Sequence, residues 1–173
     1  RRQRQMCIRD RVKTSRLETG VLTLHPQPCE ISTTVQRAAA QYAPKVQQKE
    51  IALHIGQTQG HAVFDPKWTE EAICNLLDNA VKYTPAGGTV TVAVKNYELF
   101  SAIQVADTGP GICEEEQAKI FARFYRAPGA WQSEGVGIGL FLTRQIAEKQ
   151  GGYVKIESTP GKGSVFSLFL PHP

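Results

Sequence analysis

Hydrophobic and polar positions follow two different periods along this chain. In three segments the apolar residues recur at helical spacing, which is typical of helices with one buried face. Elsewhere apolar and polar residues alternate in short runs bounded by Gly, Pro or Asn, which is typical of strands. The expected helices are residues 32–49, 67–83 and 138–149. The expected strands are residues 51–55, 62–64, 89–96, 101–106, 153–158 and 164–170, with an edge strand in residues 21–31.

The connections between these elements restrict the fold. Tight turns join the two strands in residues 89–106 and the two in residues 153–170, so each pair must be antiparallel. Ser32 is a candidate N-cap for the first helix, and Pro44 is a candidate kink within it. The simplest architecture is a single mixed, mostly antiparallel sheet with three main helices on one face. We therefore expect an α+β fold, in the form of a two-layer α/β sandwich.

Composition and charge exclude several classes of protein. The 173 residues are 41% hydrophobic and 21% charged, as expected of one globular domain. The net charge of +4 comes from residues 1–16, which hold seven basic groups and one acid; the remainder holds 13 basic and 15 acidic residues. We therefore expect no nucleic-acid binding. No apolar run is long enough for a membrane span, and no secretory signal is visible. We expect a cytoplasmic domain without membrane contact, and leave open whether the full-length protein is anchored in the plasma membrane.

The helix expected at 67–83 has two chemically different faces. Its apolar arc, which should face the core, consists of Ala72, Ile73, Leu76, Leu77, Ala80 and Val81. Its polar arc consists of Glu71, Asn75, Asp78, Asn79 and Lys82. The two asparagines are poor helix formers and lie one turn apart. A carboxamide oxygen can bind a hard cation such as Mg²⁺, and a lysine can bind a phosphate. An ordinary solvated face is the alternative.

Residues 107–137 are rich in Gly and Pro and contain one short helical piece at 114–121. Long irregular segments of this kind are often functional or disordered. Residues 107–111 (Asp-Thr-Gly-Pro-Gly) allow close approach to a flat ligand, and the aspartate can accept a hydrogen bond from an amine such as that of adenine; a turn is the alternative. Residues 135–139 (Gly-Val-Gly-Ile-Gly) open a helix, where free N–H groups favour an anion. Residues 161–164 (Gly-Lys-Gly-Ser) have the wrong spacing for a P-loop and predict a hairpin turn.

Taken in order, these segments resemble the catalytic domain of bacterial sensor histidine kinases. That domain belongs to an ATPase superfamily that also includes DNA gyrase, a heat-shock chaperone and mismatch-repair proteins. Its sequence boxes are matched by residues 75–84 (N box), 107–111 (G1 box), 121–126 (F box) and 135–140 (G2 box). Residues 15–20 are similar to the end of the dimerisation-domain helix. The resemblance covers residues 12–171 and implies a Bergerat-type ATP-binding fold.

The resemblance also implies a role for each matching residue. Asn79 would ligate Mg²⁺ with Asn75 beside it, and Lys82 and Arg126 would contact phosphates. Glu71 matches an acidic position that acts as a base on an incoming imidazole. The other implied ATP-binding positions are Tyr83, Asp107, Gly109, Gly111, Ile112, Phe124, Gly135, Val136, Gly137, Ile138, Gly139 and Leu140. Among these, Asp107 would accept the adenine amine. Gly135, Gly137 and Gly139 would present backbone amides to the phosphates, beneath a lid formed by residues 127–135.

The implied reaction moves the γ-phosphoryl group of ATP to a histidine on a separate dimerisation domain. The phosphoacceptor of the family lies in a His-Glu/Asp-x-x-Thr/Ser-Pro sequence. None of the four histidines of this chain has that context: His25, His54, His61 and His172. We therefore do not expect the fragment alone to phosphorylate itself.

The resemblance implies three segments and several partners. Residues 1–11 would be a disordered or non-native tail, residues 12–20 the end of the dimerisation helix or a linker, and residues 21–171 the ATP-binding domain. The implied partners are the protein's own phosphoacceptor domain and a response regulator, with the full-length protein a homodimer. The alternatives are an anti-sigma-type serine kinase, an ATP-driven clamp and a non-catalytic ATP-sensing docking module.

Overall fold

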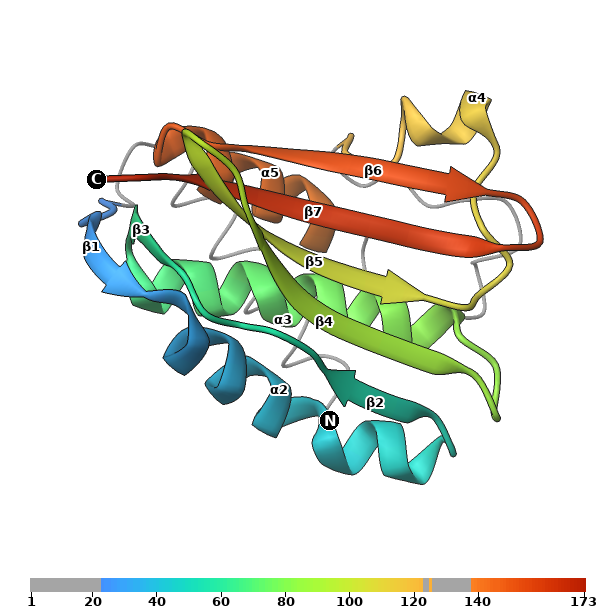
Figure 1. Ribbon diagram of the computed structural model, residues 1–173. Helices are drawn as coiled ribbons and strands as arrows, with labels where there is room; N and C mark the ends of the chain where they lie inside the picture. Colours follow the sequence, from blue (N-terminus) through green and yellow to red (C-terminus); the bar gives the residue numbers. More distant parts are fainter. Residues whose placement is uncertain (1–22, 123–124, 126–137) are drawn as a thin grey trace, which may run out of the picture.

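A computed structural model describes residues 23–122, 125 and 138–173, and its elements follow the order that the hydrophobic pattern predicts (Figure 1). The helices are α2 (Ile31–Gln48), α3 (Pro66–Tyr83), α4 (Glu114–Gln117) and α5 (Gly139–Lys149). The strands are β1 (Gln27–Glu30), β2 (Ala52–Ile55), β3 (His61–Phe64), β4 (Thr89–Asn96), β5 (Phe100–Asp107), β6 (Tyr153–Thr159) and β7 (Gly163–Pro171). Within the described ranges, no helix combines the length and the apolar character that crossing a membrane requires.

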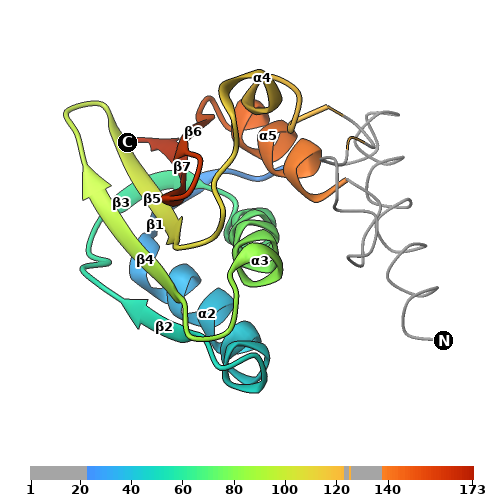
Figure 2. The same cartoon turned by 90° about the vertical axis from the view of Figure 1, so that its right-hand side faces the viewer.

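Five strands form one mixed sheet in the order β2-β4-β5-β7-β6. β2 runs parallel to β4, whereas the pairs β4–β5, β5–β7 and β6–β7 are antiparallel. The hairpins β4–β5 and β6–β7 confirm the pairs predicted from the tight turns. The helices α2, α3 and α5 lie on one face of the sheet (Figure 2). The expected two-layer α/β sandwich is therefore confirmed.

β1 and β3 pair with each other in a separate antiparallel sheet of two strands. The expectation of a single sheet is wrong in this respect. The reason lies in the segment after β2, which continues to bond along β4. The Gly56 N–H donates to the Val92 carbonyl at 2.8 Å, and the Val94 N–H donates to the Gln57 carbonyl at 2.7 Å. Because this segment occupies the edge of β4, β3 takes β1 as its partner.

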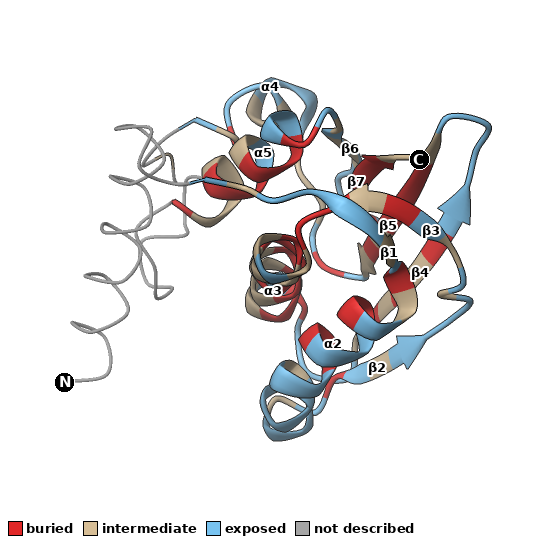
Figure 3. Ribbon diagram, turned by 90° about the vertical axis from the view of Figure 1, so that its left-hand side faces the viewer, coloured by how far each residue is buried: buried red, intermediate tan, exposed pale blue. Residues whose placement is uncertain are grey.

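α3 is the central helix of its layer and packs against both α2 and α5. It begins after Asp65, whose carboxylate accepts hydrogen bonds from the N–H groups of Lys67 (3.0 Å) and Trp68 (3.2 Å). The predicted apolar arc is buried, with exposures of 0–8%: Ala72, Ile73, Leu76, Leu77, Ala80 and Val81. Buried residues, red in Figure 3, lie where the helices and the sheet face one another. The core therefore lies between the two layers, with the polar arc of α3 outside it.

Two local predictions for the helices are wrong in detail. Ser32 is not the N-cap of α2, because the cap position is Glu30. The Ser32 hydroxyl donates to Glu30 Oε1 at 2.6 Å, so it is engaged with a side chain rather than with the helix start. α2 includes Pro44, as expected, and the kink at Pro44 stays a prediction. The short helix expected at 114–121 ends at Gln117 and is followed by turns.

Candidate functional site

The polar arc of α3 lies at the edge of the core. All five of its residues are half-buried, as the two-faced helix predicts: Glu71, Asn75, Asp78, Asn79 and Lys82. The side-chain nitrogen Nδ2 of Asn75 is buried, and no group in the described part of the chain bonds to it. A buried N–H group without an acceptor costs about 1–3 kcal/mol. This position therefore suits a ligand that supplies an oxygen atom.

The ammonium group of Lys82 forms an ion pair within α3. Its Nζ lies 3.0 Å from Asp78 Oδ2, one turn earlier. Lys45 of α2 approaches the other oxygen of Asp78, at 3.8 Å. Lys49, the C-cap residue directly after α2, donates to the backbone carbonyls of Val81 (2.6 Å) and Lys82 (2.9 Å). Lys45 of α2 and its C-cap Lys49 thus contact the last turns of α3, where Lys82 lies.

Asp107 ends β5, and the turn that follows holds its carboxylate. The Gly109 N–H donates to Asp107 Oδ1 at 2.8 Å. Burial raises the pKa of Asp107 above its ordinary value, while the backbone N–H groups of Gly109 and Ser164 act in the opposite direction. A carboxylate has about four acceptor positions. Asp107 therefore keeps the capacity to accept a hydrogen bond from an exocyclic amine.

Two glycines let this turn pass close to other backbone segments. A Cβ on Gly109 would lie 2.9 Å from the Tyr83 carbonyl oxygen, at the end of α3. Gly111 has a φ of 74°, and a Cβ there would collide with the Thr159 carbonyl of the β6–β7 hairpin. The predicted glycine turn is therefore the place where α3, β5 and the last hairpin meet.

Gly163 and Ser164 lie beside Asp107 and were not predicted from the sequence as part of the site. Ser164 is buried and pairs with Asp107 across the β5–β7 ladder. Its hydroxyl lies 2.7 Å from Ser158 Oγ, which in turn accepts from the Ile112 N–H at 2.7 Å. A Cβ on Gly163 would collide with the Asp107 carbonyl. The signal in the sequence was the glycine directly before the expected last strand, since a glycine at a strand often marks the close approach of another backbone.

The start of α5 lies beside the polar face of α3. A Cβ on Gly139, the first residue of α5, would lie 3.8 Å from the Asn75 side chain. Ile138 is 1% exposed and fixes this start in the core, against which Leu140 also packs. A helix start presents free backbone N–H groups that favour an anion. The polar face of α3, which carries the N box, and the start of α5, which belongs to the G2 box, are therefore neighbours. The order of these segments in the sequence could not establish this contact.

Five predicted ligand positions lie outside the described residues: Arg126, Phe124, Gly135, Val136 and Gly137. The predicted lid at 127–135 and the segments 1–11 and 12–20 lie outside them as well. The beginning of the F box is described. The rings of Phe121 and Phe166 pack edge to face, with their centroids 6.3 Å apart. This contact joins the F box to β7.

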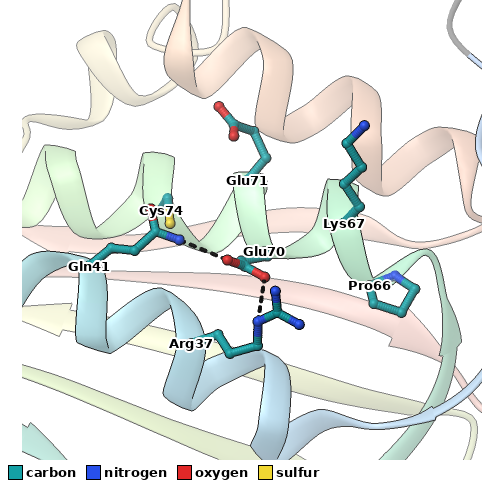
Figure 4. Close-up of a pocket in the computed structure, with 7 residues that line it drawn as sticks. All are labelled: Arg37, Gln41, Pro66, Lys67, Glu70, Glu71 and Cys74. Carbon is teal, nitrogen blue, oxygen red and sulfur yellow. Dashed lines mark hydrogen bonds and ion pairs between the residues drawn. The ribbon is translucent and has the colours of Figure 1, made fainter.

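A hollow of about 360 Å³ lies between α2 and α3, before the turn that carries Asn75. Its lining residues are Arg37, Gln41, Pro66, Lys67, Glu70, Glu71 and Cys74. Glu70 accepts a hydrogen bond from Gln41 Nε2 at 2.7 Å and pairs with Arg37 at 3.3 Å (Figure 4). Figure 4 shows Glu71 pointing away from this pair, toward α5. Glu71 therefore points to the side of α3 on which α5 begins.

Comparison with known proteins gives one family. The family described as histidine kinase-, DNA gyrase B-, and HSP90-like ATPase matches residues 64–173. Sensor protein kinase PmrB of Pseudomonas aeruginosa is 34% identical over 158 residues, which make up 91% of this chain and 33% of PmrB. The chain thus spans about a third of the length of that relative.

Solved structures agree with this family. The mycobacterial sensor histidine kinase MprB matches with a TM-score of 0.74 and 25% identity, over 86% of this chain and 99% of that chain. Full-length ShkA in complex with AMPPNP matches with a TM-score of 0.79 and 27% identity, over 94% of this chain and 34% of that chain. Both matches extend over most of the described sheet and helices.

Proposed function

The chain belongs to the histidine kinase-, DNA gyrase B- and HSP90-like ATPase family, and we propose that it is the ATP-binding kinase domain of a two-component sensor. In this proposal residues 21–171 bind ATP, and the γ-phosphoryl group is transferred to a histidine on a separate dimerisation domain. The observation that carries the proposal is the meeting of three segments: the polar face of α3, the turn after Asp107 and the start of α5. The AMPPNP complex of the similar protein ShkA supports ATP as the ligand.

The adenine end of the ligand lies at the turn after β5 in this proposal. Asp107 accepts the hydrogen bond of the adenine amine, because its carboxylate is held by the Gly109 N–H. Gly109 and Gly111 keep the backbone free of side chains where a flat ring approaches. Ile112 and Tyr83 supply apolar surface. Tyr83 is 37% exposed, so it has surface to give to a ligand.

The phosphate end lies between α3 and α5. Asn79 and Asn75 would hold Mg²⁺ through their carboxamide oxygens, which are suitable hard ligands. The buried Nδ2 of Asn75, an N–H donor, would bond to a phosphate oxygen. When bound, Mg²⁺ supplies positive charge beside the phosphate oxygens. Lys82 contacts a phosphate, and the N–H groups at Gly139 and Leu140 face the same anion. The proposal also includes Ile138 and, outside the described residues, Phe124, Arg126, Gly135, Val136 and Gly137.

Transfer in this proposal depends mainly on positioning and charge neutralisation. The bond between the γ-phosphorus and its bridging oxygen breaks, a phosphorus–nitrogen bond to the imidazole forms, and ADP leaves. Glu71 accepts the proton of the incoming imidazole. The direction of the Glu71 side chain, toward α5, supports this role (Figure 4).

The partners follow from the same proposal. They are the protein's own dimerisation domain, which supplies the histidine, and a response regulator, and the full-length protein is a homodimer. The proposal keeps residues 12–20 as the end of the dimerisation helix or a linker, and residues 1–11 as a disordered or non-native tail. The domain acts on the cytoplasmic side, and its near-neutral body binds neither nucleic acid nor membrane. The names of the relatives, which are sensor kinases, support the dimerisation domain and the response regulator as partners.

Calorimetric titration with ATP, with and without Mg²⁺, tests the proposal. We expect Mg²⁺-dependent binding that Asp107→Ala abolishes. Glu157→Ala is the matched control, because it removes an exposed carboxylate of β6 that pairs with Lys155. Absence of binding by the wild-type chain would mean that the sequence boxes are vestigial or need the missing helices, and would favour a docking role over a kinase. Transfer to a protein serine instead of a histidine would favour the anti-sigma-type alternative.

A further inference from the structure

Asp78 lies between two ammonium groups that come from different helices. Its Oδ2 is 3.0 Å from Lys82 Nζ on α3, and its Oδ1 is 3.8 Å from Lys45 Nζ on α2. The side chains of Asp78 and Lys82 are 25% and 27% exposed, whereas that of Lys45 is 52% exposed. Lys45 also lies over the Tyr42 ring, 5.0 Å from its centroid, which restrains it near this position. One half-buried carboxylate thus serves two cations.

The backbone at Lys82 is held independently of this ion pair. Lys49 donates to the carbonyl of Lys82 at 2.9 Å and to that of Val81 at 2.6 Å. Because these bonds fix the last turn of α3, only the Lys82 side chain has to reorient for its ammonium group to change partner. Rotation of a side chain of this length is fast and needs no change in the fold.

We propose that Asp78 is a positioning residue that holds Lys82 until a nucleotide binds. Lys82 then pairs with a phosphate of the nucleotide, and Lys45 of α2 replaces it as the ion-pair partner of Asp78. This inference rests on the proposed function, in which Lys82 contacts a phosphate. When Lys82 leaves, the Asp78 carboxylate stays half-buried and near an incoming polyanion, which is unfavourable. Lys45 already contacts the second oxygen of Asp78, so it lowers the cost of that exchange. Nucleotide binding therefore tightens the contact between α2 and α3.

Two single variants and their combination test the exchange by calorimetric titration of Mg·ATP. Asp78→Asn releases Lys82 without competition, so we expect ATP to bind about two- to fivefold more tightly, the size typical of a partly exposed ion pair. Lys45→Ala removes the substitute cation, so ATP should bind more weakly by a similar factor. In the Asp78→Asn background, Lys45→Ala should have no effect. Asp78→Glu keeps a carboxylate and should behave like the wild type.

Two controls accompany these variants: adenosine as a ligand, and a variant at an ion pair that contains no lysine. Adenosine has no phosphate, so all variants should bind it equally. Arg37→Ala removes a positive charge from α2 and breaks a different ion pair between α2 and α3, Arg37–Glu70. It should leave the affinity for ATP unchanged. Thermal unfolding of each variant separates a loss of fold from a change in binding.

The contrary outcomes are distinct. Weaker ATP binding by Asp78→Asn would mean that Asp78 supports the ligand directly, and would overturn the exchange. If Lys45→Ala weakened ATP binding in the Asp78→Asn background as well, Lys45 would act on ATP only as a distant positive charge. That result would also overturn the exchange. Failure of the proposed function looks different, since the wild type would then not bind ATP, or Lys82→Ala would bind it as tightly as the wild type.

Discussion

The backbone carbonyl of Asp107 faces Gly163 so closely that a side chain at Gly163 would collide with it. Gly163 also has a φ of 94°, in the region that favours glycine. Both constraints act at the first residue of β7, directly before Ser164, which pairs with Asp107. We expect the carboxylate of Asp107 to recognise adenine. The last hairpin can pack against Asp107 only because position 163 has no Cβ.

Gly163→Ala should destabilise the protein more than Gly161→Ala does. Gly161 has a similar φ of 81°, but a Cβ there would meet nothing within 4 Å. We expect Gly161→Ala to cost about 1–2 kcal/mol from the backbone conformation alone. Gly163→Ala adds a collision with backbone, which should cost about 1–3 kcal/mol more. Urea unfolding of both variants measures the difference, and equal losses would show that β7 can shift away from Asp107.

Asp107→Asn should change the dependence of stability on pH. The pKa of Asp107 is raised above its ordinary value of 3.8 by burial, so the folded state holds its proton more tightly than the unfolded state does. Wild-type stability should therefore fall as pH rises from 3.8 through the raised pKa, and the penalty is absent below 3.8. The Asn variant lacks this carboxyl, so its stability relative to the wild type should increase across that window. Unfolding measured at several pH values gives the difference in unfolding free energy between the variant and the wild type. A difference that does not change with pH would contradict the prediction and would mean that the carboxyl is equally solvated in the folded and unfolded states.

Asn79→Ala should abolish phosphoryl transfer while the fold survives. Loss of a group that stabilises developing charge costs on the order of 10²–10³ in rate. Alanine is a better helix former than asparagine, and Asn79 is half-buried, so thermal stability should be unchanged or higher. Transfer to a separately supplied dimerisation domain with its histidine gives the rate. Gln47→Ala, at an exposed position of α2, is the control. An unchanged rate would remove Asn79 from the proposed metal site.

Asp65→Ala should destabilise α3 and with it the candidate site. Asp65 is 7% exposed and caps the helix through the N–H groups of Lys67 and Trp68, and its second oxygen accepts from the His25 N–H at 2.9 Å. Loss of a cap costs about 0.5–2 kcal/mol, and the N–H group left without an acceptor adds to it. Asp65→Asn keeps an acceptor and should lose less. Denaturant midpoints compare the two, and an equal loss would assign the effect to charge rather than to capping.

The two faces of α3 could be predicted because side-chain spacing alone determines them. The predicted apolar residues from Ala72 to Val81 are buried in the structure, whereas Asn75, Asp78 and Asn79 between them are half-buried. Strand positions were predicted for the same reason, since β4 has the bounds that its alternating pattern indicates. The roles given to Asn79 and Lys82 come from the resemblance and remain predictions.

Contacts between segments far apart in the sequence could not be predicted in this way. Nothing local to Asp107 indicates that Ser164 is its partner, because the pairing of β5 with β7 is decided by the whole sheet. The contact of Lys45 with Asp78 depends likewise on how α2 packs against α3. The separate pairing of β1 with β3 depends on the segment that continues along β4. In each case tertiary packing, rather than periodicity, selects the neighbour.

β7 is the last strand along the described chain, yet it lies between β5 and β6. Until the ribosome has released residues 163–171, β6 has no neighbour in the sheet, and β5 is paired on one side only. The sheet can therefore close only after this segment has been synthesised, whatever the order in which the earlier elements form. A nascent chain that ends before Gly163 would contain Asn79, Asp107 and Gly139, but it would lack the strand that pairs with β5 beside the Asp107 carboxylate. Because of the position of β7, the site can assemble only in chains in which residues 163–171 have been translated.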